Sequence, residues 1–184
     1  MKCGKTLLPA CLIDSRLMLD RRQKINLAAA LLCFGMVAWA IFYAGRVLGL
    51  VPCPLCMFQR VCIGALCVVF LIAALHPARR TGAIVYGVLI FLVAGVTTWV
   101  AARHVWIQSQ PAGTVPSCGA PLDSLLEMFP VLEVIRRVMT GGGECGLVDW
   151  TLLGISMPGW VLIVAVSLGL VGILNNIVYP ARRT

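Results

Sequence analysis

Four long apolar runs are the feature that most constrains how this chain can fold. They cover residues 25–45, 57–75, 83–102 and 159–179. Each is close to the roughly 20 helical residues that cross a hydrocarbon core of about 30 Å. Inside a bilayer the backbone must satisfy its own hydrogen bonds, so each run is expected to be a helix. The sequence therefore predicts an all-α membrane protein with four transmembrane helices.

Composition and connection lengths favour a single membrane domain. Hydrophobic residues make up 60% of the 184 residues and charged residues 12%, whereas a soluble domain is about half apolar and a quarter charged. Residues 76–82 form so short a connection that the second and third helices must be antiparallel neighbours. We predict one antiparallel four-helix bundle over residues 25–180, without a separate soluble domain.

Basic residues beside the apolar runs predict the orientation. Six lysines and arginines lie in residues 1–24, two arginines lie in 76–82, and two more lie in the tail at 181–184. By the positive-inside rule these three segments are cytoplasmic, and the loops at about 46–56 and 103–158 lie on the opposite side. The net charge of +8 is thus mainly a topology signal, and we expect no nucleic-acid binding.

Residues 1–24 are predicted to be a basic cytoplasmic extension without a recognisable motif. The apolar run that follows is longer than the 7–15 residues of a signal-peptide core, so we expect an uncleaved membrane anchor. Met18 is an alternative start within this extension.

The nine cysteines fall into two groups. Five lie in the extension or inside apolar runs, where we expect reduced thiols that behave as small hydrophobes: Cys3, Cys11, Cys33, Cys62 and Cys67. The other four lie in the two loops on the non-cytoplasmic side, where disulfides persist: Cys53, Cys56, Cys118 and Cys145. An even number favours pairing.

The Cys53-Pro54-Leu55-Cys56 segment opens the second apolar run. Pro54 suits the first position of a helix, which puts Cys56 in the first turn, where the helix dipole favours an anion. Arg60 follows Cys56 by four residues and so lies on the same helical face. A helix N-terminus and a nearby cation both lower the pKa of a thiol. We predict a stable Cys56 thiolate at the depth of the lipid headgroups.

This segment has two other interpretations. It could be a static disulfide, or half of a metal site, because Cys-x-x-Cys is also a zinc spacing. A structural zinc site needs two more ligands at suitable spacing, but Cys118 and Cys145 do not form a second close pair, and His104 is the only nearby histidine. A redox role is therefore favoured, and we expect no bound metal.

The second pair lies in flexible surroundings. Turn-forming residues precede Cys118, and three glycines at 141–143 come shortly before Cys145. A structural disulfide here would stabilise the fold by about 3 kcal/mol. Mobility, however, favours thiol–disulfide exchange, because the attacking sulfur must reach its target.

Residues 122–138 show helical spacing of apolar residues, interrupted by Pro130. We predict a short, kinked amphipathic helix, either lying on the membrane surface or packed against the ends of the bundle. Nearby, Arg103 and His104 lie where the third helix leaves the membrane, as headgroup ligands or interfacial anchors. Four tryptophans fit an aromatic belt at the interface: Trp99, Trp106, Trp150 and Trp160.

In their order and on these sides, the motifs resemble the bacterial disulfide bond formation protein B family, DsbB. The resemblance covers about residues 25–180. It rests on Cys53-Pro54-Leu55-Cys56 with Arg60 after it, the lone Cys118 and Cys145, and the Leu-Gly-Ile-Ser-Met-Pro-Gly-Trp segment at 153–160. It implies a quinone-dependent protein-disulfide oxidoreductase of the bacterial inner membrane, with both termini cytoplasmic and both cysteine loops periplasmic. The basic extension is not part of the family pattern.

The resemblance also implies partners and roles. The carrier would be a periplasmic DsbA-like dithiol protein, and the cofactor a membrane quinone, either ubiquinone or menaquinone. The implied disulfides are Cys53–Cys56 and Cys118–Cys145. Cys118 would be attacked by the carrier, and Cys145 would then exchange with Cys53.

On the quinone side, Cys56 would be the thiolate that donates electrons, with Arg60 favouring the charge-separated state and His104 lying near the quinone. Two alternatives stay open from the sequence. One is a vitamin K epoxide reductase-like protein, whose Cys-x-x-Cys normally follows the loop cysteines instead of preceding them. The other is a membrane metal-binding or transport protein that uses Cys53 and Cys56 as soft ligands.

Overall fold

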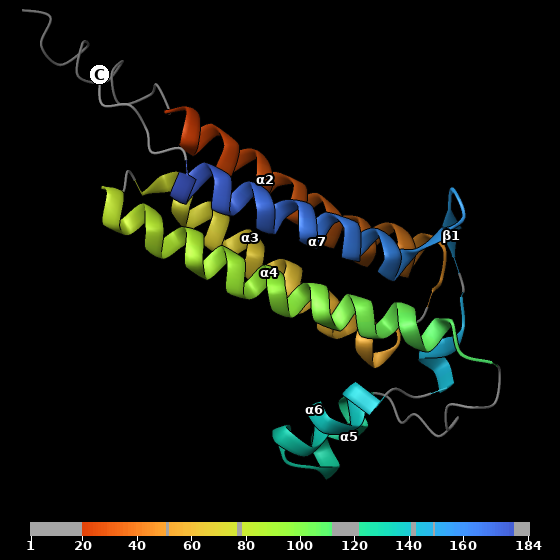
Figure 1. The fold of residues 1–184 in the computed structure, drawn as a ribbon. Coiled ribbons are helices and arrows are strands. Elements are labelled where there is room, and N and C mark those ends of the chain that lie inside the picture. The colour runs from red at the N-terminus through yellow and green to blue at the C-terminus, as the bar shows by residue number, and fades with distance from the viewer. Residues whose placement is uncertain are drawn as a thin grey trace, which may run out of the picture.

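The computed structural model describes residues 20–50, 52–76, 79–111, 122–140, 143–148 and 150–178. Within these ranges, four helices are long and apolar enough to cross a membrane: Arg21–Val47, Pro54–Leu75, Arg80–Gln108 and Met157–Val178. They form an antiparallel bundle in which α3 packs against α2 and α4, and α4 packs against α7 (Figure 1). The predicted all-α membrane fold with four spanning helices is confirmed.

The bundle helices have the following bounds. The first span is α2 (Arg21–Ala38), which continues as the π-helix η1 (Trp39–Val47), and the fourth is α7 (Met157–Ile173), which continues as the π-helix η3 (Leu174–Val178). The second and third are α3 (Pro54–Leu75) and α4 (Arg80–Gln108).

All four helices begin before the predicted apolar runs, and the first and third extend furthest beyond them, because polar residues at helix ends lie outside an apolar run. The first begins at Arg21 because Asp20 caps it. The Asp20 carboxylate accepts from the Arg21 amide (2.8 Å), and the Gln23 side chain accepts from the Asp20 amide (3.0 Å). The Asp20 side chain also accepts from the Gln23 backbone amide, so the two residues form a reciprocal capping box, which the Asp-x-x-Gln pattern of the sequence indicates. The third helix continues past Ala102 to Gln108 and thereby carries His104 into the bundle.

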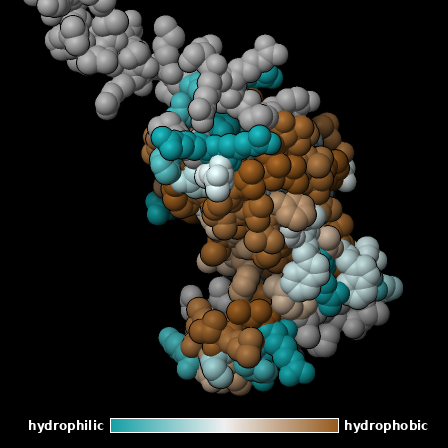
Figure 2. Space-filling model, turned by 60° about the vertical axis from the view of Figure 1, so that its left-hand side comes forward, coloured by the Kyte–Doolittle hydropathy of each residue, from teal (hydrophilic) through white to brown (hydrophobic). Residues whose placement is uncertain are grey.

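The middle of the bundle holds an apolar core, and its outside is also apolar. Small residues let α4 and α7 approach closely, because a Cβ on Gly172 would collide with Ile90 and one on Gly169 would lie 3.1 Å from Ala94. Figure 2 shows a broad hydrophobic surface over the middle of the molecule. Leucine, valine and phenylalanine side chains on this surface are exposed, as expected for helices that contact lipid.

At the end of the bundle where α2 begins and α7 finishes, three buried asparagines form a network that the sequence analysis did not identify. Asn26 donates to Asn176 Oδ1 (3.1 Å) and accepts from Asn175 (2.9 Å) and Asn176 (3.2 Å). Asn176 also donates to the Gly172 carbonyl (3.0 Å). Polar side chains of this kind bond membrane helices to one another, so this asparagine end joins α2 to η3.

The opposite end, where α3 begins and α4 finishes, carries the short elements and is called the cysteine end. They are α5 (Leu122–Met128), α6 (Val131–Thr140), the 3₁₀ helix η2 (Gly143–Gly146), β1 (Thr151–Leu152) and β2 (Ile155–Ser156). The two strands pair antiparallel as a hairpin. Its two turn residues, Leu153 (φ 55°) and Gly154 (φ 77°), both have positive φ, as a two-residue turn of type I′ requires.

The predicted amphipathic helix with a break at Pro130 is confirmed as α5 and α6, which lie beside the bundle at the cysteine end (Figure 1). One face of α6 packs against the bundle through the buried Val134 and Val138. Val131 and Leu132 lie on another face and are 65% and 80% exposed. The segment therefore packs against the bundle, and it also keeps an apolar face available for lipid.

Candidate redox centre and adjoining cavity

The Cys-x-x-Cys pair lies at the N-terminus of α3, as predicted. Pro54 occupies the first turn, and Cys53 is the N-cap, with its sulfur accepting from the Cys56 amide (3.4 Å). The Cys53 thiol also donates to Cys56 Sγ at 3.2 Å. A disulfide bond is about 2.05 Å long, so the structure holds these residues as adjacent thiols. The predicted Cys53–Cys56 disulfide stays a prediction, but it needs only a small approach of the two sulfurs.

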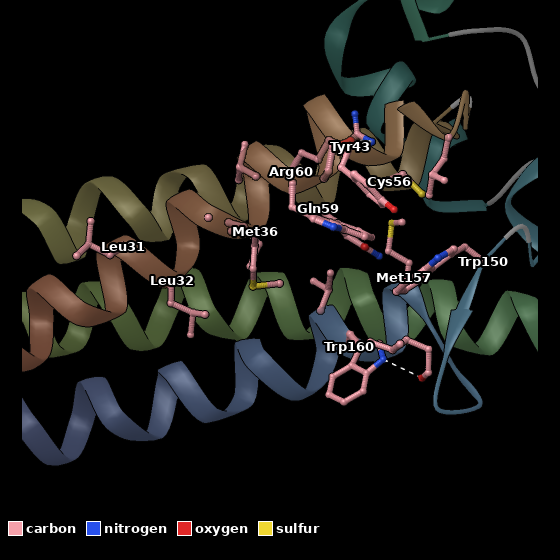
Figure 3. Close-up of a pocket in the computed structure, with 18 residues that line it drawn as sticks. Leu31, Leu32, Met36, Tyr43, Cys56, Gln59, Arg60, Trp150, Met157 and Trp160 are labelled. Carbon is pink, nitrogen blue, oxygen red and sulfur yellow. Dashed lines mark hydrogen bonds between the residues drawn. The ribbon is translucent and has the colours of Figure 1, made fainter. Parts of the chain in front are cut away.

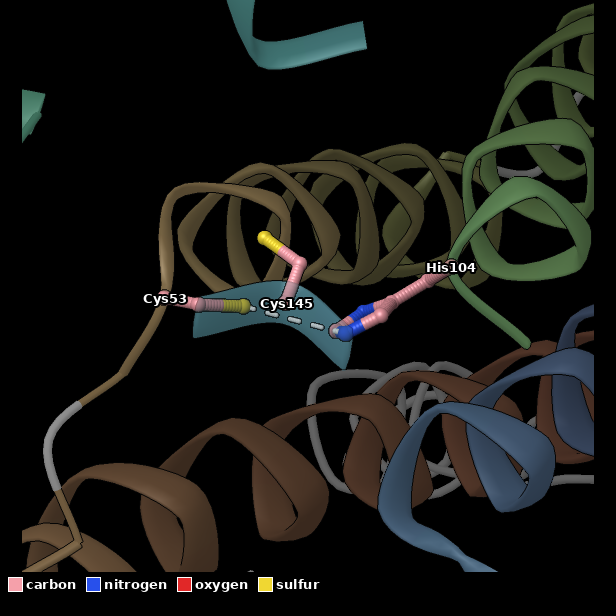
Figure 4. A group of neighbouring side chains, drawn as sticks. All are labelled: Cys53, His104 and Cys145. Atoms are coloured by element: carbon pink, nitrogen blue, oxygen red, sulfur yellow. Dashed lines mark hydrogen bonds between the residues drawn. The ribbon is translucent and has the colours of Figure 1, made fainter. Parts of the chain in front are cut away.

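Cys145 reaches the same place from η2. The Cys53 sulfur, the Cys145 sulfur and a ring nitrogen of His104 all lie within 4.8 Å of one another (Figure 4). His104 Nε2 is 3.8 Å from Cys53 Sγ, and its Nδ1 is 3.1 Å from the amide nitrogen of Gln59. All four side chains are buried. Three elements far apart in the sequence therefore meet at one sulfur, that of Cys53.

The surroundings of Cys53 favour its neutral form. The hydrogen bonds with Cys145 and with Cys56, together with burial, raise the pKa of the Cys53 thiol. Cys53 therefore remains a thiol that donates, while Cys56 accepts. A thiolate at Cys56 stays a prediction, and the hydrogen bond from Cys53 is the kind of contact that would stabilise it.

Cys118, the predicted point of attack by the carrier, lies outside the described residues. Its pairing with Cys145 and its position relative to Cys53 therefore stay predictions. Cys145 itself is buried, with 1% of its surface exposed.

A cavity of about 780 Å³ adjoins Cys56. Figure 3 shows Cys56, Gln59 and Arg60 on α3, with Trp150, Met157 and Trp160 across the cavity from them. The remaining lining is mostly aliphatic and aromatic, and comes from α2, η1 and the residue after it, α3, the hairpin and α7: Leu31, Leu32, Gly35, Met36, Val37, Trp39, Ala40, Tyr43, Leu48, Ile63, Leu152 and Val161. The site thus combines a sulfur and a cation with an apolar chamber.

Arg60 shares this cavity with Cys56, as their spacing on one helical face suggested. Its guanidinium donates to the Ala40 carbonyl (3.0 Å), in the π-helical part of the first span. This bond fixes the position of the cation at the cavity wall.

Two of the four tryptophans predicted to form an aromatic belt border the large cavity. Trp150 and Trp160 line the cavity. The Trp160 indole donates to the Leu152 carbonyl of the hairpin (3.1 Å), and Trp150 lies against Trp39, with ring centroids 5.2 Å apart. Trp99 and Trp106 are more than half exposed, and the belt itself stays a prediction. Hairpin pairing, which two-residue strands do not reveal in sequence, brings Trp150 to this site.

His104 does not line the large cavity. It borders a second, smaller one of about 50 Å³, together with Cys53, Cys56, Arg60 and Gln108. The Gln108 Oε1 atom is buried and has no hydrogen-bond partner among the described residues. Because buried polar atoms are normally hydrogen-bonded, we expect a hydrogen-bond donor, such as a water molecule, to occupy the small cavity beside this oxygen.

Comparison with known proteins identifies the same family that the order of the sequence motifs indicated. Residues 21–175 match the family described as "Disulfide bond formation protein DsbB". The chain is 51% identical over 155 residues to Disulfide bond formation protein B of Xanthomonas oryzae pv. oryzae (strain MAFF 311018), which covers 84% of this chain and 88% of the relative. It is 46% identical over 158 residues to the protein of the same name from Xylella fastidiosa (strain 9a5c), covering 85% and 91%.

The match covers the first three of these helices and most of the fourth, and it includes the Cys-x-x-Cys pair and both loop cysteines. It also decides against the vitamin K epoxide reductase-like alternative considered from the sequence, and in favour of the family in which the Cys-x-x-Cys comes first. The chain therefore belongs to the DsbB family of membrane disulfide-forming oxidoreductases.

Proposed function

We propose that this protein reoxidises a periplasmic DsbA-like dithiol carrier and passes the electrons to a membrane quinone. It would do so in the bacterial inner membrane, with both termini cytoplasmic and the cysteine end periplasmic. One observation carries the proposal: the Cys53 sulfur lies 3.2 Å from Cys56 and within 4.8 Å of Cys145. Cys53 can therefore exchange partners between the two pairs.

The carrier side begins with both pairs oxidised. A carrier thiolate attacks Cys118, which forms a mixed disulfide and releases the Cys145 thiolate. The second carrier thiol then breaks the mixed disulfide, which leaves the carrier oxidised and Cys118 reduced. Two electrons and two protons have left the carrier at this point. The buried position of Cys145 beside Cys53 favours exchange within the protein over attack by other thiols.

The transfer between pairs takes place at Cys53. The Cys145 thiolate attacks Cys53, the Cys53–Cys145 bond forms, and Cys56 leaves as a thiolate. Cys118 then attacks Cys145, which restores the loop disulfide and releases Cys53. The first helical turn and the Arg60 cation make Cys56 the better leaving group of the pair, and the raised pKa of Cys53 fits its role as the sulfur that is attacked.

The large cavity fits a quinone. Its apolar and aromatic lining suits a flat ring with an isoprenoid chain, and Gln59, Arg60 and Tyr43 supply polar groups among the lining residues. A bound quinone would accept the two electrons and two protons. Arg60 would stabilise negative charge beside Cys56, and the apolar walls would exclude water and strengthen that interaction. The Cys53–Cys56 disulfide would form again as Cys53 attacks Cys56 and the two electrons and two protons of the thiols pass to the quinone.

Quinone reduction by the purified protein with a reduced DsbA-like carrier tests this proposal. We expect Cys56→Ser to abolish reduction, while Cys67→Ser, which changes a thiol elsewhere in the bundle, preserves it. A carrier with a single active-site thiol should form a mixed disulfide with the unchanged protein, because the Cys118–Cys145 disulfide supplies the bond that breaks. It should form none with the Cys118→Ser/Cys145→Ser protein. Full quinone reduction by Cys56→Ser would refute the proposed path.

A further inference from the structure

We propose that the reduced protein binds one Zn²⁺ ion through Cys53, His104 and Cys145. The inference needs only reduced thiols and does not depend on the proposed path to quinone. The expectation of no metal rested on linear spacing, which cannot reveal that η2 brings Cys145 to the N-cap of α3 beside a histidine of α4.

The three donor atoms already lie close to the arrangement that zinc requires. Zn–S bonds of about 2.3 Å and Zn–N bonds of about 2.0–2.1 Å place neighbouring ligand atoms of a tetrahedral site about 3.5–3.8 Å apart. Cys53 Sγ and His104 Nε2 are 3.8 Å apart, and all three donors lie within 4.8 Å of one another. A shift of about 1 Å or less would therefore complete the set. Cys₂His with an open fourth position is also an established zinc ligand set.

The charge of the complex suits its burial. Cys53 is 8% exposed, and His104 and Cys145 are each 1% exposed, so an uncompensated ion would be costly there. Zn²⁺ with two thiolates and a neutral imidazole has no net charge. The two thiols lose their protons to solvent as the Zn–S bonds form, and no atom changes oxidation state.

Gln59 can hold the histidine in the form that binds metal. When Nε2 binds zinc, Nδ1 carries the ring proton, and that proton usually goes to an oxygen acceptor. The buried Gln59 amide lies 3.1 Å from Nδ1, and rotation of the amide presents its oxygen to the ring.

The small cavity supplies the fourth position. It borders both Cys53 and His104, and its volume of about 50 Å³ is sufficient for a water molecule. Gln108 Oε1 lines this cavity and lacks a partner among the described residues. A zinc-bound water would donate to this oxygen.

The consequence is a metal-bound state that is exclusive to the reduced protein. A Cys53 sulfur in a disulfide is not a thiolate ligand, so oxidation releases the ion. Conversely, a sulfur held by zinc cannot attack or be attacked, so the ion stops exchange between the two cysteine pairs.

The test uses the whole reduced protein in detergent micelles, after removal of the reductant, with Co²⁺ as the spectroscopic probe and Zn²⁺ as the competitor. We expect one Co²⁺ per chain, with a sulfur-to-cobalt band in the near ultraviolet that Zn²⁺ abolishes, and the release of about two protons per Zn²⁺ near neutral pH. The oxidised protein should bind none, which provides a control without any substitution.

Variants locate the ion. His104→Ala and Cys145→Ser should each weaken Zn²⁺ binding more than 100-fold, beyond the roughly 10- to 100-fold that loss of a hydrogen-bond partner of a ligand costs. Cys67→Ser should bind as the unchanged protein does. Cys118→Ser should bind Zn²⁺ normally while losing carrier oxidation, which separates this inference from the proposed function.

Two results would overturn the inference. One is equal binding by the oxidised and reduced proteins. The other is binding that is lost in Cys56→Ser but kept in His104→Ala and Cys145→Ser, which would assign the ion to the Cys-x-x-Cys pair alone.

Discussion

Arg103 of α4 binds the last turn of α6, so its replacement should make α6, which leads to Cys145, separate from the bundle more often. Its Nε donates to the Met139 carbonyl in the last turn of α6 (3.1 Å). Its guanidinium also lies 4.2 Å from the centre of the Trp106 ring, within its own helix, which orients it. A hydrogen bond to a charged donor contributes about 1.5–3 kcal/mol. Arg103→Gln should lower the free energy of opening α6 by this amount.

Hydrogen exchange measures that opening directly. The α6 helix has 10 residues, and an isolated helix shorter than about 12 residues is marginal in water. Undocked α6 should therefore unfold and exchange its amides. A loss of 1.5–3 kcal/mol corresponds to exchange that is roughly 10- to 150-fold faster, confined to α6 and the adjoining η2.

Arg137→Gln is the matched control. Arg137 pairs with Glu133 one turn away within α6 (3.1 Å) and lies over the Phe129 ring. An exposed pair of this kind contributes about 0.3–0.5 kcal/mol, so exchange should rise only about twofold. If Arg103→Gln leaves exchange in α6 unchanged, or if both variants accelerate it equally, Arg103 does not hold α6 in place.

Three further predictions concern the cavity, Cys53 and the asparagine end. Arg60→Gln should slow quinone reduction by at least about tenfold, with Arg60→Lys intermediate, as measured by steady-state kinetics; equal rates would contradict the proposed role of the cation. The pKa of Cys53 is raised, so only a small thiolate fraction is present near neutral pH. The rate of its reaction with iodoacetamide in the reduced protein should therefore rise about tenfold per pH unit from pH 7 to 9, as followed by peptide mass spectrometry. A plateau of this rate below pH 8 would contradict the raised pKa. Asn26→Leu removes three side-chain hydrogen bonds, each of which contributes about 0.6 kcal/mol, and leaves Asn176 without its Asn26 partner. The free energy of unfolding, measured in mixed micelles, should therefore fall by about 2–4 kcal/mol. Ser167→Ala, which removes only a bond within α7, should change the unfolding free energy by less than about 1 kcal/mol, and a comparable loss in both variants would refute a special role for the asparagines.

The sequence predicted the features that depend on local pattern. Four spanning helices follow from hydropathy, and the start of α3 follows from Pro54, whose ring is tolerated in the first turn. The break between α5 and α6 follows from Pro130, because proline lacks the backbone N–H that would continue α5. The presence of Cys56 and Arg60 at one cavity follows from a spacing of four residues on a helix.

What the sequence could not show depends on contacts between distant segments. A position of His104 near a quinone stays a prediction. The structure places His104 between Cys53 and Gln59, where it borders the small cavity and not the large one. That position is set by how α4 packs against α3, which no local pattern encodes. The approach of Cys145 to Cys53 likewise depends on α6 packing through Val134 and Val138. The asparagine network was hidden because Asn26 lies within the polar start of its helix, and its partners lie at the far end of the chain.

The asparagine network means that the two ends of the bundle differ in how strongly their helices are held together. Three amide side chains tie α2 to η3 at one end, and glycine contacts hold α4 close to α7 through the middle. At the other end, α2 leads through a π-helix into the short loop before Cys53. If the proposed quinone enters the large cavity from the lipid, we expect the helices to separate at the end around Cys56, because hydrogen bonds hold α2 to η3 at the asparagine end. The asparagine end would then stay closed while the cysteine end opens.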